Sequence, residues 1–296
     1  RHPGRHDLAD PRRARARPAF VRPIIGLRAP RNPRIGLDAA GIVESVGPDV
    51  TRFRVGDRVF ADLFSFGQGA FAEYVCAPEK AFEPIPEGMT FEDAATLPHS
   101  AVLAVQGLRL RDGRTPRPGD RVLIVGASGN VGPFAVQIAK SMGTEVTGVC
   151  STEKIDFVRS LGADHVIDYT AVDYTTAGER YDWIVDTDSH QSIVRIRRAL
   201  RPKGVYVTLG GTTWPILGAL VLGPLTSLAS SRWTGLLLWW KPFKPEDVRT
   251  VTGLIAAGKV KPAIDRRFPL GDVVEALRWV NDGHAKGKVV IAPMTA

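Results

Sequence analysis

Residues 121–132 read Arg-Val-Leu-Ile-Val-Gly-Ala-Ser-Gly-Asn-Val-Gly, and this stretch is the strongest indication of the fold. An apolar run over 121–125 ends in three glycines spaced three residues apart, and an amphipathic segment over 131–142 follows. This order predicts a strand, a tight turn and a helix, the form in which a helix N-terminus holds a pyrophosphate. The stretch therefore predicts a dinucleotide site. A chance glycine pattern in an ordinary strand–helix turn is the alternative, and the flanking strand and helix signals disfavour it.

Each glycine of the turn has its own expected task. Gly126 lets the chain leave the strand sharply, Gly129 lets backbone amides approach phosphate oxygens, and Gly132 lets the helix pack close to the sheet. Ser128 stands where the common G-x-G-x-x-G fingerprint has its second glycine. The cofactor contacts expected from this turn are Gly126, Ser128, Gly129, Asn130, Val131 and Gly132.

The end of the next expected strand, over residues 144–150, indicates which dinucleotide is bound. An NAD site usually carries Asp or Glu there, about 20 residues after the glycines, to bind the ribose 2′-hydroxyl. Here Ser151, Thr152 and Lys154 follow the strand, and Glu153 is the only acid. Hydroxyls and an ammonium suit a 2′-phosphate, so we expect Ser151 and Lys154 to bind NADPH, with NADH disfavoured. Ser151 or Thr152 could also begin the next helix as its N-cap, and both roles are compatible.

Stretches outside the turn match the pattern of a known family. They are Gly36-Leu-Asp-Ala-Ala-Gly-Ile-Val-Glu-Ser-Val-Gly47, residues 53–60, Leu161-Gly-Ala-Asp-His-Val-Ile-Asp-Tyr169, residues 254–262 and residues 283–291. Together with the glycine turn, they resemble the zinc-free quinone oxidoreductase-like branch of the medium-chain dehydrogenase/reductase superfamily. The resemblance implies that Tyr169 lies near the adenosine. Gly210 ends a later strand, where its backbone can approach the nicotinamide, and Lys288 precedes the last strand and reaches toward the cofactor.

The resemblance implies an α/β fold: a Rossmann doubly wound parallel sheet and a GroES-like β-barrel catalytic domain. The expected domains are 1–106 (GroES-like), 107–262 (NADP-binding) and 263–296 (return to the catalytic domain). The family pattern begins near residues 18–22, so we expect the barrel to lack its opening strands and 1–17 to be an atypical, Arg-rich start. Alternating signals support a parallel sheet, with strands at 121–125, 145–149, 165–167, 183–186 and 205–209 and helices at 131–142, 155–161 and 193–200. Helices expected at 92–97 and 101–110 lead into this domain, and the helix 273–281 and the strand 288–291 belong to the return to the catalytic domain.

The same resemblance implies hydride transfer without a metal. Where zinc relatives have Gly-His-Glu, this chain has Gly36-Leu37-Asp38, and its two cysteines, Cys76 and Cys150, are far apart. Tetrahedral zinc needs three or four ligands brought together, so no metal site is expected.

The expected function is therefore an NADPH-dependent reduction of a small hydrophobic quinone or α,β-unsaturated carbonyl. The sequence assigns no catalytic residue. His99 is a weak candidate for the proton donor, because a lone histidine is more often structural. The alternative is a protein that binds NADPH without turnover, because its barrel is incomplete.

The net charge of +8 arises in the N-terminal segment. Residues 1–34 carry ten arginines against Asp7 and Asp10, which leaves 29 basic and 29 acidic residues elsewhere. Prolines interrupt this segment and Phe20 is its only aromatic residue, so no nucleic-acid partner is expected. Two separated cysteines indicate a reducing compartment, and we expect a cytoplasmic protein.

An uncharged segment spans residues 204–231. Its longest clean apolar piece, 216–223, is shorter than the roughly 20 residues that cross a bilayer, so no membrane span is expected. The segment and its surroundings suit an apolar flap beside the substrate or the contact of a homodimer. The tryptophans that favour either role are Trp214, Trp233, Trp239 and Trp240.

Overall fold

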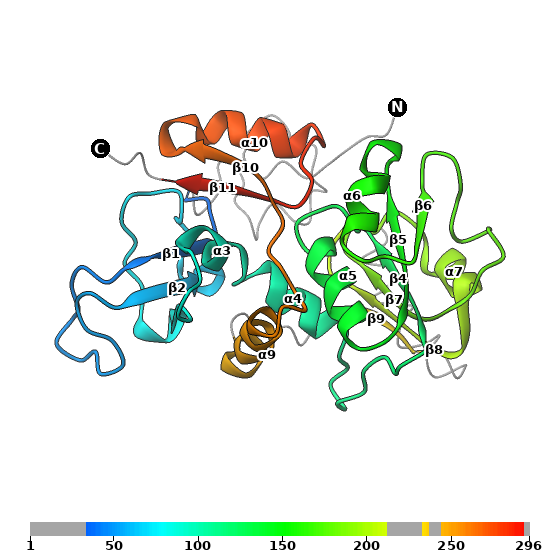
Figure 1. Ribbon diagram of the computed structural model, residues 1–296, viewed down its shortest axis with the longest axis horizontal. Coiled ribbons are helices and arrows are strands. Elements are labelled where there is room, and N and C mark those ends of the chain that lie inside the picture. The colour runs from blue at the N-terminus through cyan, green and yellow to red at the C-terminus, as the bar shows by residue number, and fades with distance from the viewer. Residues whose placement is uncertain (1–33, 212–232, 237–243, 293–296) are drawn as a thin grey trace, which may run out of the picture. The chain divides into compact units, whose positions relative to one another are not determined.

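The computed structural model describes residues 34–211, 233–236 and 244–292 (Figure 1). The chain forms two compact units. The first holds the described residues up to Pro98, Arg266–Ala285 and the described residues from Val289 on. The second holds His99–Asp265 and Lys286–Lys288. These units follow the packing of the chain, and the domain boundaries at 106/107 and 262/263 stay a prediction.

The second unit is built on a six-stranded sheet with the order β6-β5-β4-β7-β8-β9. Every neighbouring pair in it is parallel. The chain starts in the middle of the sheet and adds strands first toward one edge and then toward the other, which confirms the expected doubly wound arrangement. The strands are β4 (Arg121–Val125), β5 (Glu145–Cys150), β6 (His165–Asp168), β7 (Tyr181–Asp186), β8 (Leu200–Thr208) and β9 (Trp233–Leu236).

Apolar strands form the core of this unit. Val122, Leu123 and Ile124 of β4 are all fully buried, as expected of a parallel strand covered on both faces. Helix α5 packs on β4 and β5, and α6 contacts β5 and β6. The helices of the unit are α4 (Ser100–Gly107), α5 (Gly132–Ser141), α6 (Ile155–Ser160), α7 (Ile193–Ile196) and α9 (Pro245–Ala256), with short 3-10 helices η4 (Thr152–Lys154) and η5 (Arg197–Ala199).

The region 193–208 differs from the sequence-based expectation. The helix expected over 193–200 is α7 followed by η5, and the strand expected at 205–209 begins already at Leu200. Leu200 is fully buried and pairs with Tyr181, and the register shifts before Trp183 pairs with Val205. Pro202 and the positive φ of Lys203 are both unusual inside a strand, so residue propensities do not predict that the strand starts at Leu200.

The first unit contains a three-stranded antiparallel sheet, β1 (Asp38–Ile42), β2 (Arg58–Asp62) and β3 (Phe82–Pro84). A small apolar cluster forms around Ala61, Leu63 and Ala81. Helix α3 (Phe91–Thr96) begins at Thr90, whose hydroxyl accepts the Asp93 amide at 3.0 Å. The remaining elements are the 3-10 helices η2 (Phe64–Phe66), η3 (Glu79–Ala81) and η6 (Leu270–Asp272), the helix α10 (Val273–Asn281), and the paired strands β10 (Ile264–Pro269) and β11 (Lys288–Ala292).

The apolar segment 204–231 is described only through its start. Residues 204–208 belong to β8, and 212–232 lie outside the described residues, as do Trp214, Trp239, Trp240 and the N-terminal segment 1–33. Among the helices that the structure describes, none has the length and hydrophobicity that a membrane crossing requires.

Candidate functional site

The glycine turn joins β4 to α5, and packing explains two of its three glycines. Gly126 has a φ of +75°, and a Cβ there would come within 2.4 Å of the Thr187 hydroxyl oxygen. A Cβ at Gly132 would lie 2.2 Å from the Gly126 carbonyl oxygen. At Gly129 the nearest atom would be that same oxygen at 3.4 Å, an ordinary contact. Gly129 is therefore required by neither packing nor backbone strain, and the space left beside it fits the close approach of a phosphate.

Helix α5 presents its N-terminus at this turn. Its N-cap residue, Val131, makes no side-chain capping bond, and Pro133 occupies the first turn without a donor to satisfy. The remaining amides of that turn and the positive end of the helix dipole have the charge and the donors that suit an anion. Asn130 is exposed and Val131 is half-buried, whereas the predicted contact Ser128 is buried. A cofactor contact of Ser128 is therefore expected from its backbone and not from its side chain.

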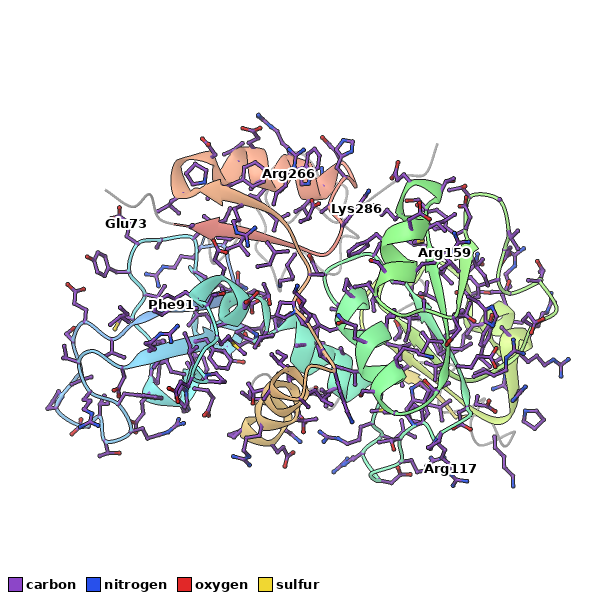
Figure 2. The ribbon with its side chains drawn as sticks, viewed as in Figure 1. Glu73, Phe91, Arg117, Arg159, Arg266 and Lys286 are labelled. Atoms are coloured by element: carbon purple, nitrogen blue, oxygen red, sulfur yellow. The ribbon has the colours of Figure 1, made fainter. Side chains whose placement is uncertain are left out.

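The end of β5 holds the residues predicted to bind the adenosine phosphate. Ser151 follows Cys150 directly, is half-buried, and its hydroxyl donates to Glu153 Oε1 at 3.2 Å. Lys154 ends η4 and is only 1% exposed. Ser151 and the exposed Glu153 are therefore more accessible to solvent than Lys154. Arg159, labelled in Figure 2, lies on α6, the helix that follows η4.

Tyr169 lies beside the same strand end. Its amide donates to the Cys150 carbonyl at 3.1 Å, and the residue is 43% exposed. The neighbouring Asp168 accepts the hydroxyls of Thr152 and Thr170, and these hydrogen bonds hold the pKa of the carboxyl below its ordinary value. The edge formed by β5 and β6 thus combines accessible hydroxyls with two carboxylates and one buried lysine.

The strands β7 and β8 form the other side of the site. Segment 187–189 leaves β7, and Gly210 and Gly211 follow β8. The Ser189 amide donates to the Gly210 carbonyl at 3.1 Å, and the Thr187 hydroxyl donates to the Val125 carbonyl at 2.9 Å. Gly210, the predicted nicotinamide neighbour, is therefore linked through segment 187–189 to the glycine turn.

A buried carboxylate lies next to this segment, at a strand end that the sequence marks as polar. Asp186 is fully buried at the end of β7, where its Oδ2 accepts the Tyr206 hydroxyl at 3.1 Å. Burial raises the pKa of Asp186 to about 7, and hydrogen bonds from Tyr206, Ser189 and the Asp188 amide counteract part of that effect. The available signal was an acid ending the apolar run 183–185.

The segment before β11 approaches the glycine turn from the opposite end of the chain. Gly287 donates its amide to the Ser128 carbonyl at 3.0 Å. The Lys288 ammonium donates to the Ser100 hydroxyl at 3.0 Å. His99, the candidate proton donor, precedes Ser100 as the N-cap residue of α4. The structure therefore places His99 and Lys288 at the same helix start.

No group of three or more His, Cys, Asp and Glu side chains able to hold a metal occurs among residues 34–211, 233–236 and 244–292. Leu37 offers no ligand atom, and Cys76 and Cys150 lie in different units. Cys150 is buried, which raises the pKa of its thiol to about 11 and keeps it protonated.

Comparison with known proteins supports the family that the sequence motifs resemble. Residues 20–87 match the alcohol dehydrogenase GroES-like domain, and residues 161–291 match a family described as zinc-binding dehydrogenase. The chain is 34% identical to the mitochondrial NAD(P)H oxidoreductase RTN4IP1 of Mus musculus, over 87% of this chain and 69% of that protein. It is 33% identical to the chloroplastic quinone-oxidoreductase QR1 of Triphysaria versicolor, over 93% and 83%.

A solved structure supports this relationship at the level of the fold. The quinone oxidoreductase of Coxiella burnetii superposes with a TM-score of 0.76 at 28% identity, over 87% of this chain and 78% of that one. The parallel sheet, the glycine turn and the GroES-like match agree with these relatives. The chain therefore belongs to the quinone oxidoreductase-like branch of the medium-chain dehydrogenase/reductase superfamily.

Proposed function

We propose that this chain transfers hydride from NADPH to a quinone or an α,β-unsaturated carbonyl, and that it does so without zinc. The observation that carries the proposal is the glycine turn, where Gly129 leaves room in front of an uncapped helix N-terminus. The family makes the chain an NAD(P)H-dependent oxidoreductase, as its relatives are named NAD(P)H oxidoreductase and quinone-oxidoreductase. NADPH, the acceptor class and zinc independence are the parts that we propose.

The chain's own residues divide into three groups in this proposal. Backbone amides at the start of α5 hold the pyrophosphate, with contacts from Gly126 to Gly132. Ser151, Lys154 and Tyr169 receive the adenosine end, and a 2′-phosphate there gains a charge-assisted hydrogen bond from the lysine. Gly210 and Lys288 lie toward the nicotinamide end, across the carboxyl ends of the strands where such sheets bind dinucleotides.

The reaction consumes one NADPH and one proton for each acceptor molecule. Bound NADPH would supply the hydride, and the acceptor gains two electrons and one hydrogen from it. The second hydrogen arrives as a proton from solvent or from a side chain. His99 is the candidate donor because it begins α4 beside Ser100, the residue that Lys288 contacts.

Zinc independence rests on the ligand set. Leu37 stands where zinc relatives have a ligand, and the two cysteines are separated between the units. Without a Lewis acid, an acceptor whose conjugation delocalises the incoming charge is favoured over a simple ketone.

The test measures NADPH consumption by the full chain with a benzoquinone, an enone and a simple ketone, each with and without a strong chelator. We expect turnover with the first two acceptors, no effect of the chelator, and no stoichiometric zinc by elemental analysis. Zinc at one atom per chain, or activity abolished by the chelator and restored by zinc, would refute zinc independence. A preference for the ketone would refute the proposed acceptor class.

Location and assembly are separate proposals. The mouse and Triphysaria relatives are named mitochondrial and chloroplastic, respectively, whereas the free thiols Cys76 and Cys150 favour a cytoplasmic location for this chain. The homodimer stays a prediction, because most of the apolar segment that suggested it lies outside the described residues.

A further inference from the structure

Two short segments extend the sheet at the edge where the proposed cofactor lies. Thr187 to Ser189 follows β7, and Leu209 to Gly211 follows β8. The Leu209 amide donates to the Asp186 carbonyl at 2.8 Å, and Ser189 pairs with Gly211 in an isolated parallel bridge. A Cβ at Gly211 would come within 2.4 Å of the Ser189 backbone. The two segments therefore run side by side at close distance.

The first of these segments also rests on the glycine turn. A Cβ added to Gly126 would come within 3.4 Å of the Asp188 Cβ, in addition to its clash with Thr187. The Thr187 amide and hydroxyl both donate to the Val125 carbonyl. Segment 187–189 is thus fixed at its start to the end of β4 and the glycine turn.

Three buried polar side chains tie the two segments together from beneath. The Tyr206 hydroxyl donates to Asp186 Oδ2 at 3.1 Å and lies 3.2 Å from the Ser189 hydroxyl. The Asp188 amide donates to the other carboxylate oxygen at 3.2 Å. Asp186 and Ser189 are fully buried, and Tyr206 is 1% exposed. We call Asp186, Tyr206 and Ser189 the buried tie.

The apolar surroundings of the buried tie make its hydrogen bonds costly to break. Tyr206 belongs to an apolar cluster with Val125, Val149 and Ile184. In such a dry environment a broken hydrogen bond leaves a polar group that water cannot satisfy. The tie therefore has one favourable arrangement, and that arrangement fixes the amides of Asp188 and Ser189.

We propose that Asp186, Tyr206 and Ser189 are positioning residues, which hold segments 187–189 and 209–211 at the spacing that aligns the nicotinamide for hydride transfer. This inference rests on the proposed function, which places the nicotinamide across the ends of β7 and β8. None of the three side chains needs to touch the cofactor. They act through the backbone that the cofactor meets.

The sharpest variant is Tyr206→Phe, which removes one hydroxyl and keeps the ring. Because small misplacements of reacting groups slow a reaction strongly, we expect hydride transfer to slow by roughly tenfold or more. The dissociation constant for NADPH should change less than about twofold, since the phosphates dominate binding through a charged site. The deuterium isotope effect with labelled NADPH should rise or stay maximal, because the transfer itself becomes slower.

Tyr181→Phe is the matched control. Tyr181 is also 1% exposed, lies in the same apolar cluster, and its hydroxyl is hydrogen-bonded to Thr147. Tyr181 begins β7, whereas Asp186 ends it, so loss of the Tyr181 hydroxyl should affect stability without slowing hydride transfer.

The experiment compares wild type, Tyr206→Phe and Tyr181→Phe by single-turnover hydride transfer and by amide hydrogen exchange without cofactor. We expect faster exchange at the Asp188 and Ser189 amides in Tyr206→Phe alone, together with slowed transfer. Unchanged exchange at both amides would overturn the buried tie, and equal transfer rates in the two variants would overturn its positioning role. If wild type binds no NADPH, the proposed function fails and the positioning role fails with it; the exchange data then still report whether the buried tie holds the two segments.

Discussion

The amide of Gly287 donates a 3.0 Å hydrogen bond to the carbonyl oxygen of Ser128. This bond fastens the glycine turn to a segment that follows it by more than 150 residues in the chain. Gly287 has a φ of +94°, and a Cβ there would lie 2.4 Å from the Ala263 carbonyl oxygen. The backbone can therefore make this contact only with glycine at position 287.

Replacing Gly287 with Ala should weaken NADPH binding by about 1 kcal/mol, the typical value of one hydrogen bond. Gly258→Ala is the control, since Gly258 also has a positive φ of +68° but no atom within 4 Å of an added Cβ. Both variants should lose stability, and fluorescence titration with NADPH should separate them. Equal affinities in the two variants would show that the Ser128 contact does not support the turn.

Gly129 and Gly132 should respond differently to alanine. Gly132→Ala places a methyl group 2.2 Å from the Gly126 carbonyl oxygen and should cost roughly 1–3 kcal/mol of folding stability by overpacking. Gly129→Ala meets no such contact, so its stability should stay within about 1 kcal/mol of wild type while NADPH affinity falls. Thermal unfolding and NADPH titration measure the two effects. Unchanged NADPH affinity in a stable Gly129→Ala protein would contradict the assignment of the phosphates to this turn.

Lys154→Ala tests the preference for NADPH. We expect NADPH binding to weaken by about 1–3 kcal/mol, the range for a hydrogen bond to a charged group, and NADH binding to stay nearly unchanged. Lys140→Ala is the control, because Lys140 lies in the last turn of α5, is paired with Asp164, and should affect neither coenzyme. Equal losses for both coenzymes in Lys154→Ala would remove the assignment of the 2′-phosphate to this lysine.

Glu153→Gln changes the same site in the opposite direction, because it should strengthen NADPH binding. Its carboxylate accepts the Ser151 hydroxyl and would repel a phosphate, so removing the charge should tighten NADPH more than NADH. A shift of roughly threefold is reasonable for an exposed charge, which water screens strongly. Coenzyme affinities measured at two salt concentrations provide the check, and an effect on NADH alone would contradict the proposal.

Asp186 should give the protein a distinctive pH dependence. Its pKa is about 7 in the folded state and near 3.8 when unfolded, so the folded state retains a proton that the unfolded state releases between these values. The stability contributed by the protonated carboxyl is therefore complete below about pH 4 and is lost as the pH rises to 7. Asp188, Tyr174 and Tyr206 are the other titratable groups that influence this region. Denaturant unfolding of wild type and Asp186→Asn at pH 5 and 7.5 should show a steeper loss in wild type, and parallel curves would contradict this.

The elements around the glycine turn could be predicted because local pattern decides them. The strand 121–125 is a continuous apolar run, and α5 follows from glycines, Pro133 and a regular apolar face. Leu200 shows the limit of prediction from local pattern. Its burial depends on pairing with Tyr181 across the sheet, which its neighbours in sequence do not indicate.

The chain positions of the candidate site residues follow from the sequence, whereas their packing does not. Ser151 and Lys154, which we predict to bind the adenosine end, follow β5 as the sequence predicts, but the burial of Lys154 results from tertiary packing. The link between Asp186 and Tyr206 joins residues 20 apart through the parallel register of β7 and β8. No local spacing in the sequence signals such a contact.

The proposed hydride transfer is tested most directly by the stoichiometry of NADPH oxidation by the wild-type chain with a benzoquinone, which the loss of nicotinamide absorbance and product analysis measure. We predict one hydroquinone formed for each NADPH consumed, at a rate that saturates with both reactants. NADPH that binds to the chain but is not consumed with any quinone or enone would contradict it, and would assign the chain to coenzyme binding without turnover.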